Sequence, residues 1–452
     1  MPITMTENEL TLAVIQTLKE GRRKAFQELM EELQPYDMAW QYKEIPEKHR
    51  YKFLAYMTIE ELTDLMGELD QDDQLDVLDR LGAKRSTKVL DLMENDELAS
   101  FLTDLEPEKM KELLGDMKRE ESQMVQDIMN YPPETAGRLM NNRFVWIKKH
   151  YTIGEAVDKL KEFAELAEYL NYLYVIDEER KLVGVVSYRD LLLAEADEKI
   201  EDVMYGRVVK VEVTEDQEEA AKLISRYDFV SLPVVKEDNT LAGVITVDDI
   251  IDVVIQEANE DIERLSASGK DIDFSTKPLV AAYRRLPWLI ILLFVGLVSG
   301  GIISGFEGTL DAVVALAFFM PMIAGMTGNT GTQSLAVVVR GLVQEDLTFK
   351  QTARLILREF WVGILIGITC GILITFVAFF WQGDLQLGLV VGSSLLLTLI
   401  IGTLAGTIIP LILYKLNVDP AIASGPLITT INDILSLLIY FGIATTFLIN
   451  LS

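Results

Sequence analysis

Five long stretches without charged side chains constrain the fold of this chain most strongly. They cover residues 286–306, 312–339, 361–382, 385–414 and about 420–450, the last interrupted only by Asp433. A helix of about 20 apolar residues crosses a hydrocarbon core of about 30 Å. Glycines recur inside these stretches at four-residue spacing, as in Gly363, Gly367 and Gly371, which is typical of close helix packing in lipid. The sequence therefore predicts five membrane-spanning helices.

Basic residues alternate between the two ends of these stretches and predict their orientation. They lie before the first span, between the second and third, and after the fourth: Arg284, Arg285, Arg340, Lys350, Arg354, Arg358 and Lys415. The loops at Glu307 and Asp384 carry none. Since basic loops stay in the cytosol, the N-terminus is predicted to be cytosolic and the C-terminus outside the cell. Residues 1–21 are polar and mixed in charge, so we expect no signal peptide and a multi-pass protein of the plasma membrane.

The chain has a formal net charge of -29, and nearly all of it precedes the first span. Residues 1–277 hold 62 acidic and 34 basic side chains, whereas residues 278–452 hold 8 and 7. Such a surface repels phosphate, which argues against nucleic acid as a partner. An acidic surface of this kind can attract cations, or its charge can serve only to keep the protein soluble. Cys370 is the only cysteine and lies in an apolar stretch, which excludes a disulfide framework and a thiolate metal site.

The second span contains an unusual polar segment, "FFMPMIAGMTGNTGTQS" at residues 318–334. Pro321 removes a backbone donor and Gly325, Gly328 and Gly331 weaken the helix, so a break is expected here. Irregular backbone at membrane depth is tolerated where it is buried in protein or lines a water-filled cavity. The polar side chains would supply an oxygen-rich surface: Thr327, Asn329, Thr330, Thr332 and Gln333. The alternative is a simple kink whose backbone groups are satisfied by neighbouring helices.

Asp433 lies about halfway along the fifth span, where a carboxylate costs roughly 2.5–3.5 kcal/mol on insertion scales. Its span is also polar and carries Ser424, Gly425, Pro426, Thr429, Thr430 and Asn432. Oxygen ligands without Cys or His suit Mg²⁺, Ca²⁺ or Mn²⁺, and one carboxylate fits Mg²⁺ because that ion keeps several waters. Asp433 as a proton relay, or as a partner of Arg358, stays open.

Residues 1–130 are predicted to form a stack of short helices, such as "TIEELTDLMGEL" and "QDDQLDVLDRL", with apolar residues three or four apart. Asp73 and Asp76 share one face of such a helix. That face is either solvated or part of a cation site.

A repeat follows, in which residues 139–147 parallel residues 203–211. Each copy ends in a strand with the motifs Gly184-Val-Val-Ser187-x-x-Asp190 and Gly243-Val-Ile-Thr246-x-x-Asp249. A hydroxyl three residues before an acid is typical of a helix start. The two units, 131–202 and 203–256, resemble a tandem pair of CBS domains. That resemblance implies an adenosine nucleotide held at Ser187, Arg189, Asp190, Thr246 and Asp249, unless these residues only cap helices.

Residues 246–265, "TVDDIIDVVIQEANEDIERL", are predicted to form a helix that joins the repeat to the first span. Asp249 and Asp252 lie three residues apart on it, and Glu257, Glu260 and Asp261 share one side. Like charges at this spacing repel by a few tenths of a kcal/mol per pair, unless cations bridge them. This connecting region, residues 257–277, is placed to couple the cytosolic part to the membrane part.

Over nearly its whole length the chain resembles the MgtE family of magnesium transport proteins, most specifically in "PMIAGMTGNTGTQS" and "VDPAIASGPLITTIND". The resemblance implies an all-α N domain (1–130), an α/β CBS pair, a connecting helix, and a pore domain of five helices (278–452). It also implies a homodimeric Mg²⁺ channel rather than an enzyme, with Mg²⁺ and membrane lipid as partners.

The resemblance also implies site residues. In the pore these are Asp433, Gly328, Asn329 and Gln333. The implied regulatory Mg²⁺ ligands are Asp216, Glu218, Asp228, Asp249, Asp252, Glu257, Glu260 and Asp261, with a looser match at Asp73 and Asp76. ATP in the CBS pair would involve Tyr172, Ser187, Arg189, Asp190 and Phe229, although not every member of the family binds it.

These observations lead to a hypothesis of negative feedback. Scarce cytosolic Mg²⁺ lets the acidic domains repel each other and opens the pore, whereas abundant Mg²⁺ bridges the carboxylates and closes it. Two alternatives stay open. One is a proton- or sodium-coupled carrier of divalent cations in which Asp433 takes up the proton. The other is a nucleotide sensor whose spans only anchor it.

Overall fold

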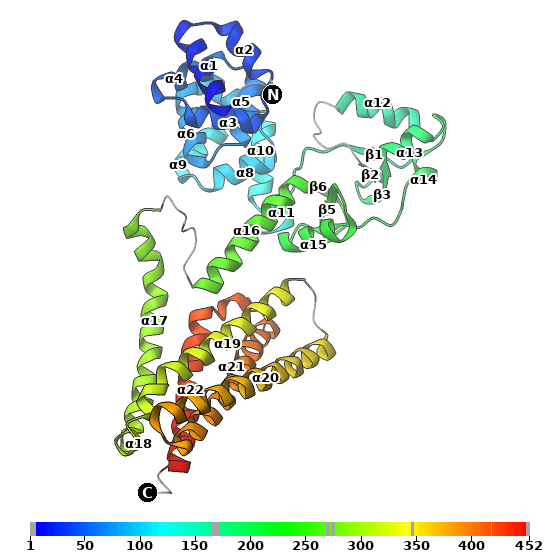
Figure 1. Cartoon of the computed structure of the whole chain (residues 1–452). Coiled ribbons are helices and arrows are strands. Elements are labelled where there is room, and N and C mark those ends of the chain that lie inside the picture. The colour runs from blue at the N-terminus through cyan, green and yellow to red at the C-terminus, as the bar shows by residue number, and fades with distance from the viewer. Residues whose placement is uncertain are drawn as a thin grey trace. The chain divides into compact units, whose positions relative to one another are not determined.

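The computed structural model describes residues 6–163, 172–267, 272, 276–344, 348–416 and 418–448, and Figure 1 shows its course. The chain divides into two compact units, residues 1–255 and 256–452. The first holds a helical N domain and two small α/β units, and the second holds the long apolar helices.

The described part of the N domain is a stack of short helices, as predicted. Their bounds are α1 (Glu7–Glu20), α2 (Arg23–Met30), α3 (Pro35–Glu44), α4 (Glu47–Tyr56), α5 (Ile59–Gly67), α6 (Gln71–Leu81), α7 (Ala83–Leu90), α8 (Asn95–Thr103), α9 (Pro107–Asp116) and α10 (Arg119–Met129). Thr6 and Thr58 start α1 and α5 through capping boxes, which satisfy backbone donors that a helix leaves open. Phe26, Phe53 and Tyr42 are fully buried in one continuous core.

Two α/β units follow, each with a three-stranded sheet of the same topology. The first contains α11 (Ala136–Leu139), β1 (Trp146–Lys148), α12 (Ile153–Phe163), β2 (Tyr172–Ile176), β3 (Leu182–Ser187), α13 (Tyr188–Leu193) and α14 (Ile200–Val203). The second contains β4 (Val211–Glu212), α15 (Gln217–Tyr227), β5 (Ser231–Val235), β6 (Leu241–Thr246) and α16 (Val247–Ser266). In both sheets the first strand pairs parallel with the second, and the second pairs antiparallel with the third. The predicted repeat is confirmed.

The start of each repeated segment packs against the last strand of the other α/β unit. Met140 fits against Gly243 of β6, where a Cβ would lie 2.6 Å from its Sδ, and Met204 fits in the same way against Gly184 of β3, at 2.5 Å. A side chain at either glycine would therefore collide with the methionine. These reciprocal contacts hold the two α/β units against each other.

The N domain contacts the start of the repeat through polar side chains on both sides. Arg143 donates to the main-chain oxygens of Met93, at 3.2 Å, and Asp91, at 3.1 Å, and forms an ion pair with Glu121. Asn95 donates from Nδ2 to Oδ1 of Asn142 at 2.6 Å. These contacts bring the N-terminal end of α8 against residues 141–143.

The second unit is a bundle of long helices (Figure 1). Its elements are α17 (Pro278–Gly305), α18 (Glu307–Ala312), α19 (Leu316–Gln344), α20 (Phe349–Gln382), α21 (Leu385–Lys415), the 3-10 turn η1 (Pro420–Ile422) and α22 (Gly425–Leu448). Within the described residues, α17, α20, α21 and α22 are long and apolar enough to cross a membrane. The helix α19 is as long but more polar, so its crossing of the membrane stays a prediction.

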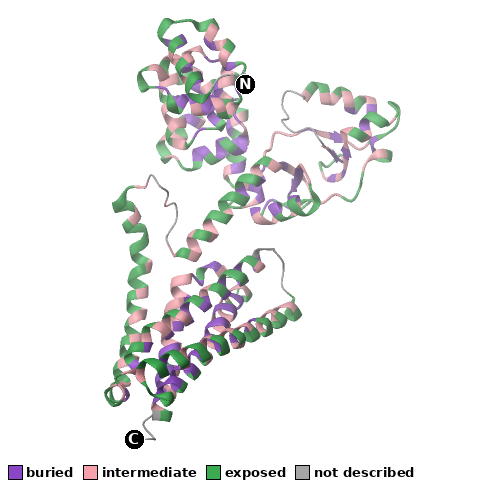
Figure 2. Cartoon of the chain, in the orientation of Figure 1, coloured by how far each residue is buried: buried purple, intermediate pink, exposed green. Residues whose placement is uncertain are grey.

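Burial differs sharply along the bundle (Figure 2). The helix α21 is packed against α19, α20 and α22, whereas α17 has no buried residue. Gly363, Gly367 and Gly371 of α20 lie against α21, where a Cβ would fall 2.5–2.9 Å from its nearest neighbour. Close packing at these glycines agrees with the prediction.

The predicted break in the second span is wrong, because α19 runs without interruption from Leu316 to Gln344. Pro321 lies inside this helix near its start, where it removes only one backbone donor. Gly328 and Gly331 are buried at helix contacts and leave the helix intact. Packing against neighbouring helices overrides the low helix propensity of glycine.

Candidate functional site

Three helices of the second unit meet at glycines with almost no space between their backbones. A Cβ on Gly331 of α19 would lie 2.0 Å from Nδ2 of Asn432 on α22. A Cβ on Gly406 of α21 would lie 2.1 Å from the main-chain oxygen of Gly331, and one on Gly402 would lie 2.9 Å from that of Thr327. Only glycine permits this approach, so the junction of α19, α21 and α22 is fixed by residue size.

Asp433 follows directly after this junction on α22 and is partly buried. Ser436, one turn later, donates to the main-chain oxygen of Asp433 at 2.9 Å. Within the described residues no side chain donates a hydrogen bond to its carboxylate. Arg358, which the sequence offered as a partner, instead pairs with the adjacent Glu359 at 2.8 Å.

The polar residues predicted on α19 divide between two faces. Asn329 and Gln333 are exposed. Pro321 and Gly325 are exposed as well, and because these four residues follow one another at intervals of four, they share one side of the helix. Gly328 is buried against Thr429 of α22, where a Cβ would lie 2.8 Å from the threonine Cγ2. Gly328 thus belongs to the helix contact, and a direct role in metal binding stays a prediction.

A buried carboxylate on α20 escaped the sequence reasoning. Glu359 is 5% exposed and accepts a hydrogen bond from Ser334 of α19 at 2.9 Å as well as the ion pair from Arg358. It ties α20 to the C-terminal end of the polar segment. The sequence signal available was an acid directly beside the uncharged stretch that starts at residue 361.

In the first unit, Asp96 at the start of α8 is also buried and was missed. One of its carboxylate oxygens, Oδ1, has no hydrogen-bond partner within the part of the chain that the structure describes. Burial raises the pKa of the Asp96 carboxyl well above its usual range, and the negative charges of Asp249 and Glu97 raise it further. Asp249 was predicted as a metal ligand.

The other predicted cytosolic ligands are spread over α15 and α16. Asp216 caps α15 by accepting from the Glu218 main-chain nitrogen at 2.8 Å, and Asp228 ends the same helix in a left-handed conformation with φ +54°. Asp252 is exposed on α16, while Glu257 and Asp261 are partly buried. No group of three or more His, Cys, Asp or Glu side chains poised to hold a metal ion occurs among the described residues. The role of these acids as ligands stays a prediction.

Asp73 and Asp76 face basic side chains in the N domain. Arg50 lies 3.4 Å from Asp73 and 3.1 Å from Asp76, and Arg80 lies 2.7 Å from Asp76. Burial alone would raise the pKa of Asp76, but hydrogen bonds from Tyr42, Arg80 and Arg50 lower it below its usual value. A cation at these acids would have to displace the arginines. Their metal role therefore stays the weakest of the predictions.

The predicted nucleotide residues lie on two separate strand ends. Ser187 and Asp190 form a capping box at α13, with Oγ of Ser187 donating at 2.6 Å to the Asp190 carboxylate. Thr246 and Asp249 repeat this contact at the start of α16. The helix-cap reading of these residues therefore describes the structure. Arg189 is exposed in the first turn of α13, and the partly buried Tyr172 starts β2. Phe229 stacks on Tyr227, with ring centroids 5.3 Å apart.

The C-terminal end of α16 meets the loop before α22. Arg264 forms ion pairs with Glu260 on its own helix and with Asp419, which begins η1. Leu265 packs on a small cluster that includes Leu335 and Ile428. The C-terminal end of α16 therefore contacts the helix bundle near the N-terminal end of α22, the helix that carries Asp433.

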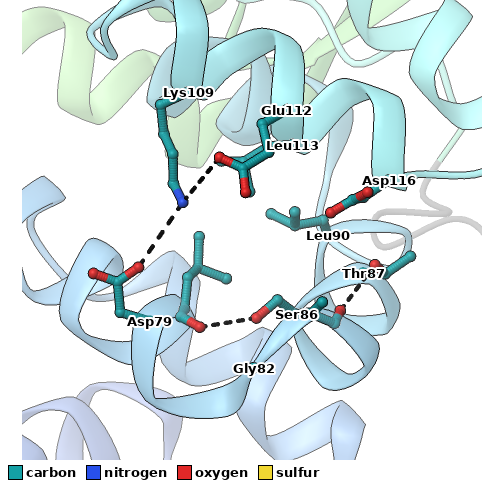
Figure 3. Close-up of a pocket in the computed structure, with 11 residues that line it drawn as sticks. Asp79, Gly82, Ser86, Thr87, Leu90, Lys109, Glu112, Leu113 and Asp116 are labelled. Atoms are coloured by element: carbon teal, nitrogen blue, oxygen red, sulfur yellow. Dashed lines mark hydrogen bonds and ion pairs between the residues drawn. The ribbon is translucent and has the colours of Figure 1, made fainter.

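A separate hollow in the N domain is shown in Figure 3. Lys109 lies there 3.4 Å from Glu112 and 3.9 Å from Asp79, and Ser86 donates to the main-chain oxygen of Leu78 at 3.0 Å. These polar groups already satisfy one another. The hollow lies between α6, α7 and α9.

Family models match most of the chain. Residues 320–443 match the divalent cation transporter model MgtE, residues 33–134 match the MgtE intracellular N domain, and residues 136–197 and 200–256 match the CBS domain. These models describe transporters and binding modules, in agreement with the prediction that the chain is not an enzyme.

The chain is similar to known proteins over its whole length. It is 59% identical to the magnesium transporter MgtE of Bacillus subtilis (strain 168), with 98% of each chain covered. It is 36% identical to the magnesium transporter MgtE of Thermus thermophilus, with 97% of this chain and 98% of the relative covered.

Two solved structures resemble about half of this chain. One, the soluble part of a magnesium transporter, shares 34% identity with a TM-score of 0.54 and covers 56% of this chain and 100% of its own. The other, the cytosolic domain of the Mg²⁺ channel MgtE in complex with ATP, shares 32% identity with a TM-score of 0.52 and covers 54% and 99%. With an N domain, two CBS units and a bundle of long apolar helices in the same order, this chain belongs to the MgtE family of magnesium transporters.

Proposed function

We propose that this protein admits Mg²⁺ through the plasma membrane along a path lined by α19 and α22. The observation that carries the proposal is the exposed polar stripe of α19 with Asn329 and Gln333, beside a span whose only carboxylate, Asp433, has no hydrogen-bond donor among the described residues. Carboxamides and a carboxylate at membrane depth are costly against lipid and normally face water or protein. Mg²⁺, which keeps several waters, suits such a sparse set of oxygen ligands.

The same stripe supports a homodimer. Asn329 and Gln333 lie on the surface of one chain, where lipid would leave their amides unsatisfied. A second copy placed against this face would enclose the polar stripes of both chains in one path. The relatives named magnesium transporter MgtE support Mg²⁺ as the ion.

Orientation follows from the basic loops of the sequence, with the N domain and CBS units in the cytosol and the C-terminus outside. The acidic cytosolic part then meets the Mg²⁺ that has entered. We expect it to sense that ion.

Feedback closure is the proposed regulation. Asp96 is buried and Asp249 is partly buried, and the charge of Asp249 adds to burial in raising the pKa of Asp96, so a divalent cation between them would favour the ionised form of both acids and hold the N domain on the CBS pair. The acids of α16 would be neutralised in the same way. Each ion that binds the closed form more tightly adds to the bias, and about 5.5 kcal/mol in total moves a 1:99 equilibrium to 99:1.

ATP is proposed as a ligand of the CBS pair in addition. A relative with 32% identity in the cytosolic part is described as a complex with ATP. The exposed Arg189 at the start of α13 and the partly buried Tyr172 and Phe229 supply a cation and aromatic surfaces for such a ligand.

Mg²⁺ flux into liposomes that contain the purified protein tests the transport function. Wild type is compared with Asp433→Ala and with Asp311→Ala, a control that removes an exposed acid from α18 outside the path. We expect flux in wild type and the control, and its loss in Asp433→Ala. Equal flux in all three would show that Asp433 is structural, and no flux in any would favour the sensor function.

Joint neutralisation of Asp252, Glu257, Glu260 and Asp261 tests the feedback. If these acids read cytosolic Mg²⁺, the variant keeps conducting at millimolar Mg²⁺ that closes wild type. A variant that closes as fully as wild type would remove them from the mechanism.

The carrier function receives support from one observation, the Asp433 carboxylate without a donor among the described residues, because such a group also suits proton uptake. Flux measured with and without an imposed proton or sodium gradient separates the two functions. Dependence on the gradient favours the carrier, and independence favours the channel.

A further inference from the structure

Asn432 has an unusual position next to the acid that the proposed function uses. Its side chain is fully buried between α19, α21 and α22. Nδ2 donates to the main-chain oxygen of Thr327 on α19 at 3.4 Å, while Oδ1 has no hydrogen-bond partner among the described residues. A buried amide oxygen without a partner costs about 1–3 kcal/mol, so this arrangement calls for an explanation.

The backbone around Asn432 is shaped to receive it. Gly331 leaves a notch on α19, since a Cβ there would lie 2.0 Å from the Asn432 nitrogen. The same glycine presses against α21, where its oxygen lies 2.1 Å from the place of a Cβ on Gly406. Thr327, whose oxygen accepts the amide, is itself fully buried. The amide therefore fixes α22 at one height and one rotation against α19.

Rotation of α22 decides where Asp433 lies. Successive residues of a helix are about 100° apart around its axis, so any turn of α22 about the Asn432 contact carries the Asp433 carboxylate with it. On α19, Asn329 and Gln333 lie two residues to either side of Gly331 and are exposed. Gly331 therefore lies at the same height along α19 as Asn329 and Gln333. In the proposed function these two side chains and the Asp433 carboxylate interact with the same ion.

We propose that Asn432 is a specificity-determining positioning residue, whose amide in the Gly331 notch sets the separation between Asp433 and the polar stripe of α19. This inference rests on the proposed function. Mg²⁺ demands near-ideal octahedral geometry and holds its waters, whereas Mn²⁺ and Ca²⁺ tolerate other arrangements. A separation altered by tenths of an ångström therefore changes the preference among ions more than it changes the passage of any one of them.

Tyr440 supplies a matched control. It also joins α22 to α19, donating from its fully buried hydroxyl to the main-chain oxygen of Leu316 at 2.9 Å. It lies seven residues from Asp433, and its contact is at the N-terminal end of α19, whereas Thr327 lies near the middle of that helix. Loss of either contact weakens the same helix pair, but only Asn432 is adjacent to the acid.

The test measures Mg²⁺ and Mn²⁺ uptake into liposomes by full-length wild type, Asn432→Leu, Tyr440→Phe and Gly331→Ala. Asn432→Leu keeps the side-chain size and removes the amide, and Gly331→Ala keeps the amide and fills its notch. We expect the ratio of Mg²⁺ to Mn²⁺ uptake to fall about three- to tenfold in both, as one lost hydrogen bond implies, and to stay at the wild-type value in Tyr440→Phe. Folding of each variant is checked by size-exclusion chromatography.

An unchanged ratio in Asn432→Leu, with total uptake reduced as in Tyr440→Phe, would reduce Asn432 to a structural role. A changed ratio in all variants would equally overturn the assignment to Asn432. If Asn432→Leu does not fold, Gly331→Ala decides the question alone. Absence of Mg²⁺ uptake by wild type would instead refute the proposed function. The uptake by wild type tests the proposed function, and the uptake ratio of the variants tests the role of Asn432.

Discussion

Arg264 in the last turn of α16 forms an ion pair with Asp419, the residue that begins η1 before α22. The same guanidinium pairs with Glu260 one turn earlier on α16. A single side chain thus forms ion pairs with one acid from α16 and one from the turn that precedes α22. It acts as a built-in cation where two carboxylates would otherwise repel each other.

Replacement of Arg264 by Gln should weaken the hold of α16 on the bundle. Since the pair is partly exposed, its loss is worth about 0.2–1 kcal/mol, which raises the cytosolic Mg²⁺ concentration for half-closure up to about fivefold. Patch-clamp recording at graded Mg²⁺ measures this shift. The charge-reversed double variant Arg264→Asp/Asp419→Arg should restore part of it, and Arg226→Gln, an exposed arginine of α15, should leave it unchanged. No shift in Arg264→Gln would mean that the pair has no part in closure.

Gly331→Ala should destabilise the bundle although alanine is the better helix former. The new methyl group meets the Asn432 amide and the main-chain oxygen of Gly402 at 3.2 Å, and overpacking of this kind costs about 1–3 kcal/mol. Thermal unfolding in detergent measures the effect. Gly341→Ala in the same helix has no atom within 4 Å and should gain up to about 1 kcal/mol. Equal stability of the two variants would contradict the crowded junction.

Asp96→Asn should stabilise the part of the chain formed by the N domain and the CBS units at neutral pH in the absence of divalent cations. The pKa of Asp96 is raised by burial and by Asp249, so the folded state prefers the protonated acid. Its stabilising contribution is complete below the ordinary pKa of an aspartate, about 3.9, and is lost as pH rises through the raised value. Asn at this position cannot ionise, so the variant does not lose this stability. The difference in free energy of unfolding between Asp96→Asn and wild type should therefore shrink as pH is lowered.

Chemical denaturation from pH 4 to 8, with and without Mg²⁺, measures this dependence. Mg²⁺ should stabilise wild type more than Asp96→Asn, because the ion neutralises an acid that the variant lacks. Asp72→Asn, an exposed acid at the start of α6, is the control and should behave as wild type. The same Mg²⁺ effect in both variants would exclude Asp96 from a cation site.

Arg189→Ala should weaken ATP binding by the full-length protein. A hydrogen bond between a charged group and phosphate contributes about 1.5–3 kcal/mol, so the dissociation constant should rise about tenfold or more. Isothermal titration calorimetry measures it, with Arg226→Ala as a control of equal charge. Wild-type affinity in Arg189→Ala would place any nucleotide away from α13.

The sequence determined the elements of this protein because their periodicity and charge are local properties. Uncharged stretches specified the long helices, and the repeated strand with its Ser/Thr and Asp specified two like units, since Ser187 and Asp190 form their capping box within four residues. The motifs around Asp433 were sufficient for the family. None of this needed knowledge of which segments touch.

Only the tertiary structure decided what the glycines of α19 do and which acids are buried. Intrinsic propensity predicted a break at Pro321 to Gly331, but contacts with α21 and α22 more than offset the low helix propensity, and the helix continues. Asp96 and Glu359 look like ordinary surface acids in the sequence and become buried only when distant segments pack on them. Burial and the approach of another charge depend on residues far away in the chain, which local pattern does not encode.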